Sequence, residues 1–171
     1  MKSISWLMLA AFVVSGCAHR IDSSPAEIDQ SWLDNFAVKG AVEVYNDQYS
    51  TGRYLVRSKR LHKWYINLKQ VTETAIVVLE DELLKRGQST EVARGGEKAL
   101  YISVVSVTYD DTGFGRRTVV ALEGSTGKDE RVKVTGENFS AEGLGANLDA
   151  AVSLAVVSLL NEEIIRDYLE E

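Results

Sequence analysis

Few side chains of this sequence are of the types that bind metal ions or carry protons near neutral pH. The histidines are His19 and His62, and the one cysteine is Cys17. A zinc site takes three or four converging Cys, His, Asp or Glu ligands. Because the histidines lie far apart in the sequence and Cys17 is assigned another role below, we expect no zinc site. We likewise predict no other metal and no cofactor.

Two runs of carboxylates are candidates for acid–base chemistry, and each has an ordinary structural explanation. Asp110 and Asp111 precede Thr-Gly-Phe-Gly, and aspartate is common in turns because its side chain bonds to nearby backbone groups. Glu80, Asp81 and Glu82 lie in a helical pattern, where at least two of them must face water. No Gly-x-Ser-x-Gly motif is present. We therefore predict that the protein is not an enzyme, and an unrecognised carboxylate site is the least favoured alternative.

Two glycine-containing stretches superficially resemble phosphate-binding loops. Gly124-Ser-Thr-Gly127-Lys128-Asp129 has two residues between its glycines where a P-loop has four. It also has an aspartate, which would repel phosphate, in place of the serine or threonine that follows the lysine. Gly143-Leu-Gly145 lacks the third glycine of a dinucleotide-binding motif and follows no clear strand. We interpret both stretches as turns.

Basic residues gather in one place, at Arg53, Arg57, Lys59, Arg60 and Lys63. On an acidic protein this is the one cluster that could meet phosphate or lipid headgroups. The alternative is two solvent-facing strands and their loop, in which lysine and arginine keep an edge strand from pairing with another chain. The sequence favours this alternative, and Arg53, Arg57, Lys59 and Arg60 are the candidate partner surface.

The net charge argues against one class of partner. The chain of 171 residues has 19 Lys and Arg against 25 Asp and Glu, a formal charge of −6. A protein gains affinity for nucleic acid by neutralising phosphates and releasing counterions, and an acidic chain gains nothing that way. We therefore expect no nucleic-acid partner. The length predicts a single domain.

The N-terminus has the composition of a secretory signal. Lys2 gives a positive start, an apolar stretch covers residues 6–14, and small residues follow. The stretch is too short to span a bilayer, which takes about 20 residues. Val14-Ser15-Gly16-Cys17 resembles the lipobox of bacterial lipoproteins. That resemblance implies a signal peptide over residues 1–16 and lipidation of Cys17, with diacylglycerol on its thiol and a fatty acid such as palmitate on its amine.

The residues after Cys17 bear on where the domain would lie. Ala18, rather than an aspartate, follows the cysteine. In lipoproteins this implies the outer membrane, facing the periplasm; the inner membrane and the cell surface stay open. The stretch to Gln30 is polar and contains Ser23-Ser24-Pro25, which is typical of a linker. We predict a lipidated tether over residues 17–30, reaching at most about 45 Å, and a domain over residues 31–171 close to its membrane.

Apolar residues recur at helical spacing in two segments, residues 71–86 and 147–169. We expect Leu79 and Val156 to lie in the core on these helices. The expected caps are Gly87 after the first helix and Asn147 before the second.

Strand patterns occur at residues 38–44, 54–57, 64–68, 100–109, 117–122 and 131–135. Asn46-Asp47-Gln48 predicts a hairpin between the first two, and the stretch 110–115 predicts a hairpin loop. Helices that alternate with antiparallel hairpins cover one face of a sheet. We therefore predict an α+β domain with an antiparallel or mixed sheet and two main helices packed on one face.

The order of these elements resembles a known group. Trp64-Tyr-Ile-Asn-Leu-Lys-Gln-Val-Thr-Glu-Thr-Ala75 leads into a helix ending at Leu84-Lys-Arg-Gly87, and a hairpin with Gly113-Phe114-Gly115 follows. The last helix ends in Asn161-Glu-Glu-Ile-Ile-Arg-Asp-Tyr-Leu169. This pattern resembles the YajG-like uncharacterised lipoproteins, whose domain is similar to the TolB N-terminal domain and to auxiliary lipoproteins of ABC transporters. It covers roughly residues 35–170, and residues 38–57 depart from it.

The resemblance implies an envelope protein that acts by contact, and it carries over no catalytic residues. The leading expectation is a non-catalytic, membrane-anchored lipoprotein that binds a protein or a lipid-like molecule in envelope assembly or transport. A regulator of a peptidoglycan-synthesis enzyme is the alternative. It requires a reach that a tether of about 45 Å makes difficult.

Overall fold

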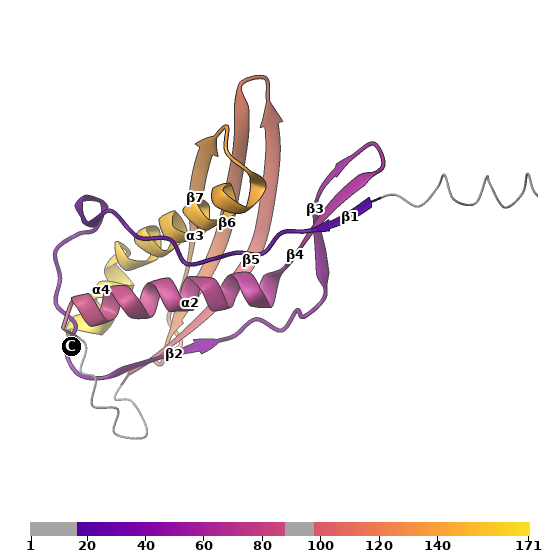
Figure 1. Cartoon of the computed structure of the whole chain (residues 1–171). Helices are drawn as coiled ribbons and strands as arrows, with labels where there is room; N and C mark the ends of the chain where they lie inside the picture. The colour runs from indigo at the N-terminus through magenta and orange to yellow at the C-terminus, as the bar shows by residue number, and fades with distance from the viewer. Residues whose placement is uncertain (1–16, 88–97) are drawn as a thin grey trace, which may run out of the picture.

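The computed structural model describes residues 17–87 and 98–171, and the predicted signal peptide lies outside them. The expected α+β class is confirmed: there are two sheets, and helices pack against the larger one (Figure 1). The elements in chain order are β1 (Cys17–Arg20), the 3-10 helix η1 (Gln30–Trp32), β2 (Val42–Asn46), β3 (Arg53–Lys59), β4 (His62–Asn67), α2 (Leu68–Lys85), β5 (Lys98–Thr112), β6 (Gly115–Thr126), β7 (Arg131–Ser140), α3 (Leu144–Leu160) and α4 (Glu163–Glu170).

The larger sheet has the strand order β2-β5-β6-β7. Strands β5, β6 and β7 are consecutive and antiparallel, whereas β2 runs parallel to β5. Helices α2 and α3 cover one face of this sheet, as predicted (Figure 1). The core lies between the helices and the sheet, and Leu79 on α2 and Val156 on α3 are buried in it. Both core predictions are confirmed.

Helix α3 approaches strand β7 closely at one glycine. A Cβ atom on Gly136 would lie 2.1 Å from the carbonyl oxygen of Ala151 and 2.1 Å from the backbone nitrogen of Ala155. Both alanines are fully buried. Small residues on both elements therefore let the helix backbone lie directly on the strand, and any side chain at Gly136 would push the helix away.

Helix α2 begins three residues earlier than the sequence pattern predicts. Its N-cap is Asn67, whose side chain accepts hydrogen bonds from the backbone N–H groups of Lys69 and Gln70. This satisfies two of the four N–H groups that a helix start leaves without partners. The helix ends as expected, because Gly87 follows it with a φ of 97° in the left-handed region.

The single C-terminal helix predicted over residues 147–169 is wrong in two respects. It begins earlier, with Gly143 as its N-cap, and Asn147 lies buried inside the first turn. It also breaks after α3, where the backbone of Glu162 is extended, and the side chain of Asn161 beside the break binds the N-terminal region. The Asn161 side chain accepts a hydrogen bond from the backbone N–H of Asp34 and donates one to the carbonyl oxygen of Trp32, both at 2.9 Å.

The predicted hairpin between residues 38–44 and 54–57 is also wrong. These segments become β2 and β3, which belong to different sheets. Gly40 has a φ of 78°, so the extended backbone starts only after it. Strand β2 instead pairs in parallel with β5, and the connection between them contains β3, β4 and α2. Alternating side chains cannot distinguish these pairings, because period two is the same in both.

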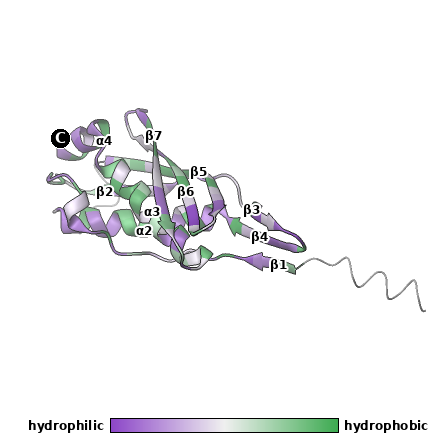
Figure 2. Ribbon diagram, turned by 90° about the horizontal axis from the view of Figure 1, so that it is seen from above, coloured by the Kyte–Doolittle hydropathy of each residue, from purple (hydrophilic) through white to green (hydrophobic). Residues whose placement is uncertain are grey.

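The smaller sheet has the order β1-β4-β3, with β3 and β4 antiparallel and β1 parallel to β4. In Figures 1 and 2 it lies at the opposite end of the molecule from α4. Its edges are β1 and β3, and its first residue is Cys17.

The prediction of a free tether over residues 17–30 is corrected by this arrangement. After β1, the segment runs over the helical layer (Figure 1). Ile21 and Ile28 are only 7% and 3% exposed, and both belong to the core. Polar contacts also hold the segment: the backbone N–H of Ser24 donates to Asp149 at 2.8 Å, and Ser153 donates to the carbonyl oxygen of Ala26 at 3.1 Å. Because the segment is polar overall, its composition did not indicate that Ile21 and Ile28 are buried. These two residues pack the segment against the rest of the fold.

Candidate functional site

The register of the smaller sheet places Cys17 beside the turn of the β3–β4 hairpin. Cys17 pairs with His62 across β1 and β4, and His62 pairs with Lys59 across β4 and β3. The cysteine is a free thiol and is exposed. We name residues 59–63 the basic turn. Neighbouring strands lie about 4.7–4.9 Å apart, so Cys17 sits one strand width from the basic turn.

Aromatic rings join β1 to β4 on one face of the smaller sheet. The His19 ring stacks against both His62 and Trp64, with centroids 5.2 Å from each, and the His62 and Trp64 rings also contact each other at 5.8 Å. The His19 Nε2 and His62 Nδ1 atoms are 2.9 Å apart and share a hydrogen bond. These contacts add side-chain packing to the backbone pairing of a short strand, and they fix the start of the chain to β4.

The structure divides the four residues of the candidate partner surface. The guanidinium of Arg57 lies 4.7 Å from the centre of the Trp64 ring and pairs with Asp111 on β5. Its side chain is only 13% exposed, so Arg57 holds the two sheets together. The remaining three, Arg53, Lys59 and Arg60, are exposed.

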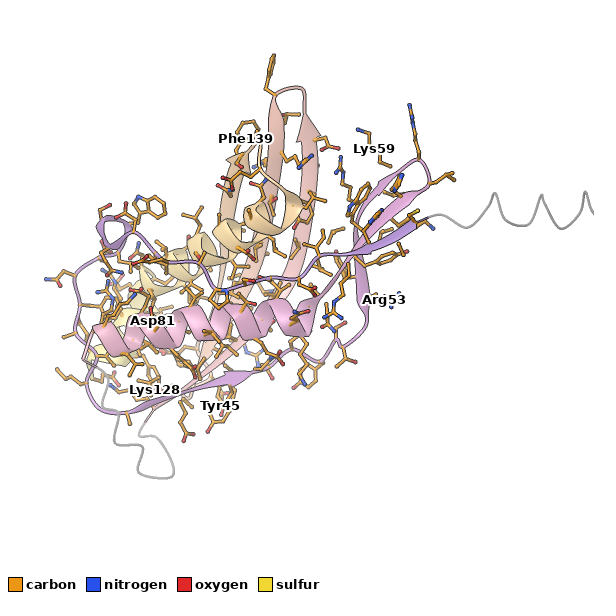
Figure 3. The ribbon with its side chains drawn as sticks, viewed as in Figure 1. Tyr45, Arg53, Lys59, Asp81, Lys128 and Phe139 are labelled. Atoms are coloured by element: carbon orange, nitrogen blue, oxygen red, sulfur yellow. The ribbon has the colours of Figure 1, made fainter. Side chains whose placement is uncertain are left out.

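Those three residues also lie apart from one another. Lys59 and Arg60 belong to the basic turn, whereas Arg53 lies at the other end of β3, opposite Asn67 (Figure 3). Arg53 lines a cavity of about 260 Å³ together with Arg20 of β1 and Tyr65 of β4. The sequence cluster is thus two separate surfaces, and the basic turn is the one beside Cys17.

The basic turn combines charge with an exposed apolar side chain. Within the described residues, Lys59, Arg60 and Lys63 form no ion pair. Leu61 is 59% exposed between them. Arg60 has a φ of 55°, which closes the tight turn. Three unpaired cations around one exposed leucine make a surface suited to a partner that is both anionic and apolar.

The acidic run on α2 has a structural role. Glu80 and Asp81 are exposed, but Glu82 is 1% exposed. Glu82 accepts hydrogen bonds from Gln30 at 2.9 Å and from Lys85 at 2.7 Å. Asp81 first, and Glu82 second, raise the pKa of Lys85 and keep it charged. The buried Glu82 carboxylate therefore ties the N-terminal segment to α2. Its hydrogen-bond partners, Gln30 and Lys85, both belong to this chain.

The other sequence motifs lie in separate parts of the fold. Asp110 and Asp111 extend β5 instead of forming the predicted loop, since β5 continues to Thr112. Gly124 lies inside β6 with Leu159 against it, and Lys128 pairs with Glu171. Among the described residues, no group of three His, Cys, Asp or Glu side chains is placed to hold a metal ion.

Comparison with known proteins gives no family for the chain: no family model matches it, and no curated protein matches it significantly. The resemblance to YajG-like lipoproteins therefore stays a prediction. In the two described parts of the chain, none of the helices has the length and apolar character needed to cross a bilayer.

Sequence reasoning missed that Cys17 and the basic turn are neighbours. The pairing of β1 with β4 joins residues far apart in the sequence, and β1 has only four residues. The available signal was Ile21 and Ile28, two large apolar residues in a polar stretch. They marked the segment as part of the core.

Proposed function

We propose that this protein is a membrane-anchored lipoprotein of the bacterial envelope, lipidated at Cys17 after removal of residues 1–16. It acts without catalysis, by binding a protein or a lipid-like partner in envelope assembly or transport. The observation that carries the proposal is the position of Cys17. It is the last residue of the lipobox-like segment, and it is an exposed residue at the start of β1.

The fold supports anchoring through this residue. Strand β1 holds the chain start against β4, so lipid on Cys17 would keep the whole domain at the membrane surface. A single acyl chain binds membranes only marginally, and stable anchoring takes more than one. Lipid on both the thiol and the amine of Cys17 would meet that requirement.

The docked N-terminal segment counts against a regulator of a peptidoglycan-synthesis enzyme. That alternative needs a tether to cross part of the periplasm, and residues 17–30 would supply at most about 45 Å if extended. In the fold, Ile21 and Ile28 are buried, so extending the segment would expose both. The shorter reach favours partners that lie at the same membrane.

The test is metabolic labelling with a palmitate analogue in a bacterium that processes lipoproteins. Wild type should incorporate lipid and lose its signal peptide, whereas Cys17→Ser should do neither. Ala18→Ser is the matched control, since it introduces the same hydroxyl one residue later and keeps the thiol. Absence of lipid in wild type, or lipid retained by Cys17→Ser, would overturn the proposal.

Localisation has its own test. The outer-membrane assignment depends on the residue after the cysteine, so Ala18→Asp should move the lipidated protein to the inner-membrane fraction of a sucrose gradient. Wild type should sediment with the outer membrane. Equal distribution of both variants would contradict the assignment while leaving lipidation intact.

A further inference from the structure

Three features meet at one end of the molecule. The residue expected to carry lipid, Cys17, lies beside the basic turn, and the turn presents, around Leu61, cations that have no ion pair within residues 17–87 and 98–171. Figure 3 shows Lys59 at the tip of the β3–β4 hairpin, which projects from the body of the domain. The region between residues 53 and 63 contains five basic residues and no acidic one.

We propose that the basic turn is a membrane-contact surface, which docks on anionic phospholipid headgroups beside the lipidated Cys17 and holds the domain in one orientation. The inference rests on the proposed lipidation of Cys17. The domain would then touch the membrane at two points, the lipid on Cys17 and the basic turn, and the partner of the basic turn would be the membrane itself.

The position of Cys17 brings the turn to the bilayer. Acyl chains on Cys17 enter the membrane, and the backbone of Cys17 is paired to His62 within the same sheet. With strands about 4.7–4.9 Å apart, the turn cannot lie far from the headgroups to which the anchor leads. A free tether would allow any distance between the turn and the membrane up to the length of the tether, whereas a docked β1 fixes that distance.

The composition of the turn fits a headgroup layer. Lysine and arginine place their charge among lipid phosphates while their stems lie along apolar surface. Leu61, 59% exposed, is an apolar side chain at the projecting tip, where it can enter the boundary between headgroups and acyl chains. An anionic surface potential extends about 8 Å at physiological salt. It would therefore reach the cations of a turn that lies one strand width from the anchor at Cys17.

The charge of the rest of the domain favours the same orientation. The chain is acidic overall, and residues 162–171 at the other end contain five acidic residues and one basic residue. Figures 1 and 2 place α4 and the smaller sheet at opposite ends. An anionic membrane attracts the basic turn and repels the α4 end, so the two forces act together.

Protection of a strand edge does not account for this surface. Strand β3 is an edge strand, and basic residues along it do guard against pairing with another chain. Arg60 and Leu61, however, lie in the turn between β3 and β4, where no strand edge needs protection. An exposed leucine would also weaken such protection.

The experiment places an environment-sensitive fluorophore on the lipidated full-length chain in vesicles. Lipid occupies the thiol of Cys17, the single native cysteine, so an introduced cysteine is the one site of labelling. Leu61→Cys carries the label at the basic turn. Leu84→Cys is the matched control, because Leu84 is a 48% exposed leucine in the last turn of α2, far from β4.

In phosphatidylcholine vesicles with one part in three phosphatidylglycerol, the label at residue 61 should shift to the blue and be quenched by nitroxide lipids. The label at residue 84 should remain as in water. The shift at residue 61 should weaken at high salt, since the screening length falls to about 3 Å at 1 M. Equal exposure of both labels to water in these vesicles would overturn the proposal.

Charge reversal tests the cause of docking. Lys59→Glu with Lys63→Glu should lower the ratio of docked to undocked molecules by roughly 25-fold or more, from about fivefold per basic residue. Lys39→Glu with Lys69→Glu changes the net charge equally, away from the turn, and should keep the docked signal. An equal loss in both double variants would refute contact by the basic turn.

Failure of the two proposals is distinguishable. If Cys17 carries no lipid, mass spectrometry shows this and the chain does not float with vesicles, which removes the anchor and the docking together. If the chain is lipidated and floats but residue 61 stays in water, the anchor stands and the docking surface is wrong.

Discussion

The two sheets of this protein differ in how many buried core residues their strands supply. The four-stranded sheet is covered by α2 and α3, and its strands supply fully buried residues such as Leu100, Ile102 and Leu122. The three-stranded sheet buries Ile66 but leaves Leu55 on β3, and Leu61 in the turn after it, about half exposed. The helix-covered face of the four-stranded sheet therefore supplies much of the core, whereas the strands of the three-stranded sheet contribute little to it. The difference indicates where substitutions should unfold the protein and where they should change its contacts alone.

The largest effect should come from the helix-covered sheet. Leu79→Ala removes a side chain that is 1% exposed and should lower the free energy of unfolding by about 2–5 kcal/mol. That is a large share of the roughly 5–15 kcal/mol typical of a domain. Leu84→Ala, on the same helix but exposed, is the control and should change little. Equal stabilities of the two variants in urea would show that α2 does not bury this face.

A smaller loss should follow where α3 lies on β7. Gly136→Ala places a methyl group 2.1 Å from the α3 backbone and should cost about 1–3 kcal/mol, the usual range for overpacking. Gly113→Ala is the matched control, since nothing lies within 4 Å of a Cβ there. Thermal unfolding of both variants measures the difference. A Gly136→Ala variant as stable as Gly113→Ala would contradict the close approach of helix and strand.

Substitution in the N-terminal segment should also lower the free energy of unfolding, by less than substitution in the core beneath α2. Ile21→Ala removes a buried side chain directly after β1 and should cost about 2 kcal/mol, the low end of the range for such truncations. A flexible tether would show no loss at all. Chemical denaturation of Ile21→Ala beside Ala18→Ser, an exposed position on β1, separates the two cases.

The smallest effect belongs to the solvent-facing side of the large sheet. Arg117 and Glu137 form two hydrogen bonds of 2.6 Å, and Arg117 lowers the pKa of Glu137 from 4.5. The pair should stabilise the fold above about pH 4.5, and the contribution should disappear as the pH falls through the lowered pKa. Glu137→Gln should thus melt slightly below wild type at pH 7, and the difference in melting temperature should shrink as the pH falls below 4.5. A difference in melting temperature between wild type and Glu137→Gln that grows as the pH falls would contradict a stabilising pair of Arg117 with ionised Glu137.

The sequence predicted the structure best where the signals for an element lie within that element or next to it. The stripe that contains Leu79, and Gly87 after it, predicted α2 to within three residues at its start, because helical periodicity and a left-handed stop are local signals. The two-helix, one-face arrangement followed from the order of the elements.

It was least informative where distant segments meet. The pairing of Cys17 with His62, and of Val42 with Lys98, depends on contacts that no local pattern contains. The same is true of the break after Asn161, whose side chain binds the distant chain segment near Trp32. The basic cluster was found from the sequence, but its division into Arg57, which holds the sheets together, and the exposed basic turn required the fold.

The most direct test is hydrogen exchange of the lipid-anchored chain in vesicles, followed at the amides of residues 18–21. If β1 is docked on β4, the N–H groups of this edge strand that face β4, which occur at alternate residues, should be protected. Ile21 is the clearest case, because its N–H donates to the carbonyl oxygen of Tyr65 at 2.9 Å. Protection should then resemble that of β4. Complete exchange of residues 18–21 at the first time point, with β4 still protected, would show a free tether and contradict a domain held at its membrane by β1.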